Sequence, residues 1–270
     1  MEYKEILPPP VLSDYVRHFW YIEYINEASE NIPFRIMADG FPSLLFQYKN
    51  QFKDSETLTY SFPGCLLMGH THNVRDLVID GAFGVFGVAL FPFTPSLLYQ
   101  LPGSIFANNI ISAKDLFRHE DSYLEERVAL ATSNEDRIQI LTVYLIEKLC
   151  KCNPLTDVLI QDIVKYIIQT KGVLSIETLM MSVDISRRQF ERRFIHHVGM
   201  SPKVFSRIIR FQNTLRYSPT AKIRNLTSLA FAYRYADQAH FIREFKEFSG
   251  INPKYYFAHQ EEAAENLIQL

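Results

Sequence analysis

The chain has 270 residues, with 28 Lys and Arg against 30 Asp and Glu, 47% hydrophobic residues and three cysteines. This composition can bury a sizeable core, excludes a disordered protein and suits two ordinary domains. Three cysteines are too few for a disulfide framework, which favours a reducing, cytoplasmic location. Residues 1–10 are acidic and proline-rich where a signal peptide needs a basic start and an apolar stretch, so we expect no export.

The first part of the chain has the texture of a β-rich domain. Short apolar runs at residues 43–48, 65–68 and 85–91 alternate with Pro-Gly and Asp-Gly turns, as in a small antiparallel sandwich or barrel. Residues 81–113 contain no Asp, Glu, Lys or Arg, but their prolines and glycines favour buried strands over a membrane span. We therefore expect a β-rich domain over residues 1–121 and no membrane partner.

A helical segment follows over residues 122–154. Asn134 is expected to cap a helix whose apolar positions Ile138, Leu141, Leu145 and Leu149 share one face. This stripe suits packing against a second copy in a homodimer, or against the β-rich domain of its own chain, and the sequence leaves both open. A helix-breaking Asn-Pro pair at 153–154 marks the next boundary.

Charge is divided unevenly along the chain. Residues 155–257 hold 16 basic and 8 acidic residues, for a net charge of +8, whereas residues 1–154 carry −7 and the tail over residues 258–270 carries −3. A basic domain attached to an acidic one predicts that the C-terminal half meets a polyanion.

The basic domain contains an internal repeat with an offset of 51 residues. The matched pairs are Phe190 and Phe241, Arg192 and Arg243, Phe194 and Phe245, Gly199 and Gly250, and Pro202 and Pro253. In each copy, a short apolar helix (residues 176–183 and 226–233) leads through a tight turn to an N-cap, Ser186 or Asp237. A second helix then ends at the glycine, and the proline begins the next segment. Two helices joined by a tight turn, twice over, predict a pair of helix-turn-helix units.

A helical wheel separates the two faces of each second helix. Phe190 and Phe194 lie about 40° apart and must face the core, and Arg188, Arg192 and Ile195 lie on the opposite side. In the second copy the outward positions are Ala239, Arg243 and Lys246, with Gln238 at the N-terminal edge. Arginine can donate two hydrogen bonds to guanine, and Gln can pair with adenine. The flanking Arg187 and Arg193 are expected to hold phosphates. A helix starting at Pro202 and running to residue 217 would separate the two helices that are expected to read DNA by about 22 Å.

These stretches, SRRQFERRF at 186–194, GMSP at 199–202 and DQAHFIREFKEFSGINP at 237–253, resemble the AraC/XylS family of bacterial transcription regulators. The resemblance covers residues 155–257 and implies a monomer that binds an asymmetric DNA site through two helix-turn-helix units. It implies base contacts at Arg188, Glu191, Arg192, Gln238, Ala239 and Arg243. The family usually has glycine in each inter-helix turn, where this sequence has Asp184 and Arg234, and Arg tolerates a positive φ less well than Asp.

The front half more weakly resembles the cupin-like sensor domains that precede this module in the family. That resemblance implies a small effector of unknown identity, and RNA polymerase as a further partner. Gly64, His70, His72 and Asp76 follow the spacing of the first metal motif of cupin enzymes, with both histidines on one side of a strand. A metal site needs a ligand from a later strand, and residues 81–113 contain no His, Glu, Asp or Cys.

The sequence thus predicts an α+β protein with a β-rich sensor, a helical linker, a double helix-turn-helix domain and an acidic tail. Its predicted function is sequence-specific binding of double-stranded DNA to regulate transcription, without a cofactor and without catalysis. The alternative is a metal-dependent cupin-type enzyme fused to a DNA-binding module.

Overall fold

The computed structural model describes residues 2–24, 32–50, 52–55, 64–79, 81–117, 123–152, 157–173, 180, 185–216 and 225–258. The helix predicted over residues 176–183, apart from Met180, lies outside this part of the chain. Asp184 and residues 259–270 of the acidic tail also lie outside it.

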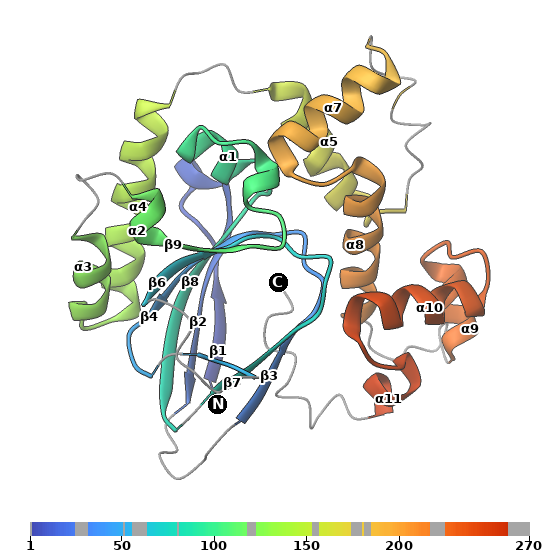
Figure 1. Cartoon of the computed structure of the whole chain (residues 1–270), viewed down its shortest axis with the longest axis horizontal. Helices are drawn as coiled ribbons and strands as arrows, with labels where there is room; N and C mark the ends of the chain where they lie inside the picture. Colours follow the sequence, from blue (N-terminus) through green and yellow to red (C-terminus); the bar gives the residue numbers. More distant parts are fainter. Residues whose placement is uncertain are drawn as a thin grey trace.

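The N-terminal part contains two antiparallel sheets, which confirms the predicted β-rich domain (Figure 1). The larger sheet has the strand order β1 (Glu2–Ile6), β2 (Val16–Tyr24), β8 (Phe83–Leu90), β4 (Ser43–Gln47), β6 (Cys65–Met68) and β9 (Ile110–Ser112). The smaller sheet has the order β3 (Ile32–Ile36), β7 (Arg75–Ile79) and β5 (Lys53–Asp54). The three apolar runs found in the sequence are the strands β4, β6 and β8.

The larger sheet is buried on both faces. Alternate side chains of β2 point to opposite sides, so that Trp20 packs toward the smaller sheet while Phe19 packs toward the helices. Every residue of β8 is buried. Coverage on both sides explains why β8, within the uncharged segment 81–113, carries no charge, because a charged side chain on either face would have to leave water. None of the helices in the described residues has the length and apolar character needed to cross a bilayer.

Helices cover the outer face of the larger sheet. They are η1 (Pro10–Leu12), α1 (Thr94–Tyr99), η2 (Gly103–Ile105), α2 (Ala113–Leu116), α3 (Leu124–Leu130) and α4 (Asn134–Lys151). Leu141 and Leu145 of α4 are buried in one cluster with strand residues, so the apolar stripe packs on the β-rich domain of its own chain. Ser133 caps α4, and not Asn134 as expected, because its Oγ accepts a hydrogen bond from the backbone N–H of Asp136 at 3.1 Å.

The C-terminal part is helical, as predicted. Its helices are α5 (Val158–Gln169), α7 (Arg187–Val198), α8 (Pro202–Leu215), α9 (Leu226–Ala232), α10 (Gln238–Ser249) and α11 (Pro253–Ala258). Figure 1 shows α8 running between α7 and α10 on the side of the sheets opposite α4. Its 14 residues span about 21 Å at 1.5 Å per residue.

A segment between β3 and β4 joins the two parts through a common core. The backbone N–H of Ala38 donates to the carbonyl of Phe248 at 2.9 Å, and the side-chain amide of Gln212 donates to the carbonyl of Ala38 at 2.6 Å. Met37 and Phe41 lie on either side of Ala38 in the same hydrophobic cluster as the cores of both helix-turn-helix units. The N-terminal part therefore completes the core of the C-terminal part.

The ends of α7 and α10 also lie on the N-terminal part. Gly199 follows α7 with φ 85° and packs against Gly103 of η2, and Gly250 follows α10 with φ 75° and lies beside Val74 and Arg35. The positive φ favours glycine at both C-terminal positions. The two matched glycines of the repeat are thus contact points with the other part of the chain.

We expect Gly103→Ala to lower the free energy of unfolding by about 1 to 3 kcal/mol, as overpacking of a rigid site does. An added Cβ would lie 2.5 Å from the backbone nitrogen of Gly199 and 2.8 Å from the carbonyl oxygen of His197, and neither atom can move without shifting α7. Urea unfolding of the full chain measures the change. Ser104→Ala on the exposed side of η2 is the matched control and should change it by less than about 0.5 kcal/mol. Equal effects of the two substitutions would contradict a rigid contact between η2 and α7.

Candidate nucleic-acid interface

The first candidate reading helix, α7, has one buried and one exposed face. Ser186 begins it with a capping box, in which the Ser186 side chain accepts from the backbone N–H of Gln189 and the Gln189 side chain accepts from that of Ser186. Phe190 and Phe194 are fully buried, as the wheel predicts. The opposite face is exposed and carries Arg188, Arg192 and Ile195.

The two flanking arginines of α7 have different surroundings. Arg187 is exposed and forms an ion pair with Glu191 one turn further along, at 3.1 Å. Arg193 instead turns to α5, where its Nε and Nη2 each donate to a carboxylate oxygen of Asp157 at 2.6 Å. Asp157 also caps α5, so this ion pair ties α7 to the start of α5. The structure therefore directs Arg193 toward the protein and leaves Arg187 at the surface.

The second candidate reading helix, α10, repeats the arrangement of α7. Asp237 caps it by accepting from the backbone N–H of His240 at 2.6 Å. Phe241 and Phe245 are fully buried. The outward positions Gln238, Ala239, Arg243 and Lys246 are all exposed.

The turn before α10 contains the unusual arginine of the sequence. Arg234 adopts φ 55°, the left-handed conformation in which glycine is favoured. The chain thus keeps the turn geometry and tolerates the strain of a side chain there. In the same unit, Thr227 of α9 donates to the side-chain oxygen of Gln238 at 2.7 Å, which holds this amide at the start of α10.

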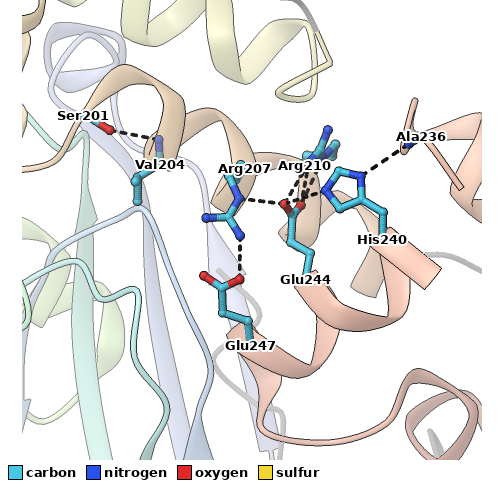
Figure 2. A network of polar contacts seen from close by, with 8 residues as sticks. All are labelled: Ser201, Val204, Arg207, Arg210, Ala236, His240, Glu244 and Glu247. Atoms are coloured by element: carbon cyan, nitrogen blue, oxygen red, sulfur yellow. Dashed lines mark hydrogen bonds and ion pairs between the residues drawn. The ribbon is translucent and has the colours of Figure 1, made fainter. Parts of the chain in front are cut away.

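A buried carboxylate holds α10 on α8 (Figure 2). The Glu244 side chain is 1% exposed and accepts hydrogen bonds from Arg207 at 2.7 Å and from both Nε and Nη2 of Arg210. Arg207 also reaches the exposed Glu247 at 2.6 Å. Because two guanidinium groups from α8 surround one carboxylate from α10, this network fixes the second reading helix relative to the spacer.

The candidate metal ligands do not form a site. His70 and His72 lie in the loop after β6 and not on a strand, so the expectation that they face the same side is wrong. His70 is buried, which lowers its pKa to about 4, whereas His72 is exposed and lies 3.0 Å from the Asn108 side chain. Asp76 forms an ion pair with Arg35 at 2.6 Å. No three His, Cys, Asp or Glu side chains of the described residues are grouped as metal ligands.

Comparison with known families agrees with the geometry of the two reading helices. Residues 180–259 match a family described as a helix-turn-helix domain, and residues 4–112 match a domain of unknown function (DUF6597). Residues 180–259 therefore contain a helix-turn-helix domain. Within it, α10 follows α9 through a tight turn, and α7 occupies the matched position of the repeat.

Similar solved structures include those of ToxT from Vibrio cholerae. One crystal structure of ToxT shares 13% sequence identity with this chain at a TM-score of 0.47, and 88% of this chain and 97% of that chain are covered. An unsaturated fatty acid bound ToxT shares 13% identity at a TM-score of 0.45, with 88% and 94% covered. No curated protein sequence matches the chain.

Two contacts of the C-terminal part could not be expected from local sequence patterns alone. Asp157 stands at the predicted domain boundary, where no pattern points to an ion pair with α7. Glu244 did carry a signal, because it lies three residues after Phe241 and one before Phe245, on the buried face of α10. An acidic residue inside an apolar stripe predicts a buried charge with a cationic partner.

We expect Arg234→Gly to raise the free energy of unfolding by about 0.5 to 1 kcal/mol. Glycine relieves the cost of a left-handed side-chain residue, and its greater freedom in the unfolded chain offsets part of that gain. Urea unfolding measures the difference. Ala236→Gly, an exposed position in the same turn without a positive φ, should not stabilise the chain. A loss of stability in Arg234→Gly would show that this side chain makes a contact that outweighs the strain.

We expect Glu244→Ala to destabilise the chain by about 3 to 5 kcal/mol, because Arg207 and Arg210 would keep their charges without a carboxylate between the helices. Glu247→Ala is the matched control. It removes an ion pair of the same Arg207, but Glu247 is 53% exposed, so the expected loss is under about 1 kcal/mol. Thermal and urea unfolding of both variants give the comparison, and similar losses would refute the central role of Glu244.

Proposed function

We propose that the protein is a transcription regulator of the AraC/XylS family that reads one asymmetric site on double-stranded DNA with α7 and α10, and that a small effector bound by its N-terminal domain modulates this binding. The proposed division is a sensor over residues 1–121, a helical linker over 122–154, the DNA-binding domain over 155–257 and an acidic tail over 258–270. We further infer a cytoplasmic protein that acts with RNA polymerase and without catalysis.

The observation that carries the proposal is the equivalent placement of Arg192 and Arg243. Both arginines stand on the exposed face of a capped helix, opposite a pair of buried phenylalanines, at matched positions of the repeat. An exposed arginine on one helix is ordinary for a protein surface, but the same position on two helices that each have a side-chain N-cap and a C-terminal glycine points to a shared task. Bidentate recognition of guanine in the major groove suits this side chain.

The other outward residues take roles that follow from their positions. We assign base contacts to Arg188, Glu191, Gln238 and Ala239, and phosphate contacts to Arg187 and Lys246. Arg193 would reach a phosphate only through its remaining N–H groups, two on Nη1 and one on Nη2, because Asp157 engages Nε–H and one N–H of Nη2. The α8 helix spans about 21 Å, and the widths of the reading helices bring their separation toward the roughly 34 Å between successive major grooves.

The effector role is supported by the contacts between the two parts of the chain. The N-terminal part touches the ends of both reading helices, at Gly199 and Gly250, and shares a core with them around Ala38. A ligand that changes the packing of the N-terminal part therefore acts on groups in direct contact with α7 and α10. A second copy of the chain is not needed for an asymmetric site, and the α4 stripe that would suit a homodimer is already packed on the sheet.

Selection of duplexes from a random DNA pool tests the proposal. The full-length chain at near-physiological salt should enrich an asymmetric motif with two blocks about 10 base pairs apart. Arg192→Ala should relax one position in one block and Arg243→Ala one position in the other, each at a cost of about 1 to 3 kcal/mol in binding free energy. Arg187→Ala should weaken all sequences alike and reduce the slope of log K against log salt by about one.

Both base-contact variants should keep the unfolding curve of the wild type, because Arg192 and Arg243 are exposed. An unchanged sequence preference in both variants would refute the base contacts. A single enriched block would leave α10, after the strained Arg234, without a reading role.

A further inference from the structure

A cavity of about 260 Å³ lies at the junction between the N-terminal part and the first reading helix. Its walls come from α1 and the loop after it, from the start of α5 and from the last turns of α7. The interior between the two sheets, lined by Trp20 and Ser43 among others, has only about 10 Å³, which is room for one water molecule. Within the described chain, the junction offers far more room for a small molecule than this interior does.

The floor of the cavity is apolar. Phe93 is 3% exposed and belongs to the core that both parts share, Leu97 follows it on α1, and Ile160 of α5 is fully buried. A dry apolar cavity of about 150 Å³ is enough to bind benzene. A space of 260 Å³ therefore admits one or two fused rings with a polar substituent.

The rim carries hydrogen-bonding groups that are not engaged by the described residues. Gln100 after α1, Gln161 of α5 and His196 of α7 line the cavity, and no hydrogen bond joins their side chains to any residue in the described ranges. Amides and imidazoles can both donate and accept, so they can orient a ligand that carries either kind of group. Binding sites for small molecules commonly combine such an apolar floor with a few polar groups.

The carboxylate in the walls of the cavity is already paired. Asp157 is the acidic residue of the lining, and Arg193 neutralises it through two hydrogen bonds. Burial lowers the pKa of His197, with the neighbouring His196 and Arg193 adding to this effect and Asp157 opposing it, and a lower pKa favours the neutral imidazole. A charged ligand would lose its hydration here without gaining a free counter-charge.

We propose that this junction cavity binds an uncharged, ring-sized amphipathic molecule, with its ring on Phe93, Leu97 and Ile160 and its polar group at Gln100, Gln161 or His196. This site rests on the proposed function, since it is the effector site of that regulator. A ligand there contacts α1 and the last turns of α7 at the same time. The bound ligand therefore favours one arrangement of the contact between α1 and α7, and the affinity of the chain for DNA changes with it.

The test uses the full chain and three named probes, indole, benzamide and benzoate, with binding followed by saturation-transfer NMR. We expect indole and benzamide to bind with millimolar dissociation constants, as suits ligands of this size, and benzoate to bind at least tenfold more weakly. Saturating benzamide should change the dissociation constant for the selected duplex at least threefold. No binding of either uncharged probe, equal binding of benzoate, or an unchanged affinity for DNA would overturn the proposal.

Variants locate the site. Leu97→Trp fills the cavity from α1 and Gln161→Trp fills it from α5, and each should weaken benzamide at least tenfold. Leu7→Trp, at a side chain that is 84% exposed, is the matched control and should bind as the wild type does. Two filling variants on different helices guard against a fold defect in one, and their unfolding curves verify this. Wild-type affinity for benzamide in both would place the probe elsewhere and refute the site.

The outcomes separate this site from the proposed function. A chain that enriches a two-block DNA motif but binds neither uncharged probe refutes the cavity alone. A chain that binds both probes in the cavity but enriches no DNA refutes the proposed function.

Discussion

The backbone of Ala38 fixes the position of the N-terminal part relative to the C-terminal helices. Its N–H and its carbonyl are both buried among C-terminal helices, and both find partners there, in the carbonyl of Phe248 and the amide of Gln212. A buried backbone group without a partner costs free energy comparable to a lost hydrogen bond, so this segment can be buried only where those partners stand. The position of α10 relative to the sheets, and with it the spacing of the reading helices, depends on this pair of bonds.

Buried acids decide which arginines of the basic domain face outward. Asp157 engages Arg193, and Glu244 engages Arg207 and Arg210, all within the protein. The arginines that remain exposed on the reading helices stand opposite the buried phenylalanines. The net charge of residues 155–257 supplies attraction to a polyanion in general, whereas these two carboxylates determine the surface on which that charge is presented.

Much of the C-terminal domain could be predicted because its signals are local. Each of these signals acts within one helical turn: the N-caps Ser186 and Asp237, the left-handed glycines and the prolines after them. Each signal also occurs in both copies of the repeat, which makes the prediction firmer. The strands β4, β6 and β8 were equally readable from their apolar runs. The first helix of the first unit was predicted over residues 176–183, with Asp184 in the turn after it. Apart from Met180, these residues lie outside the described part of the chain, so that prediction stays a prediction.

The contacts that could not be predicted join residues far apart in the sequence. The spacing of His70 and His72 resembles a metal motif, but the strand ends at Met68, so the alternation that would have aligned them does not apply. No pattern in the neighbouring sequence identifies Gly103 or Ala38 as contacts of the C-terminal helices. Their role depends on which residues of the distant helices pack against them in the folded chain. Arg193 shows the same limit, since a wheel gives the direction of a side chain but not the carboxylate that meets it.

The bond between Ala38 and Phe248 also sets an order of events when the chain is made. Its two ends are more than two hundred residues apart, and contacts of such long range form late because the loop between them must first be closed. During synthesis, the strands are complete long before α10 leaves the ribosome, and until then the N–H of Ala38 can donate only to water and not to the carbonyl of Phe248. Packing of α10 therefore completes the shared core. A nascent chain acquires its second reading helix and this core in the same step.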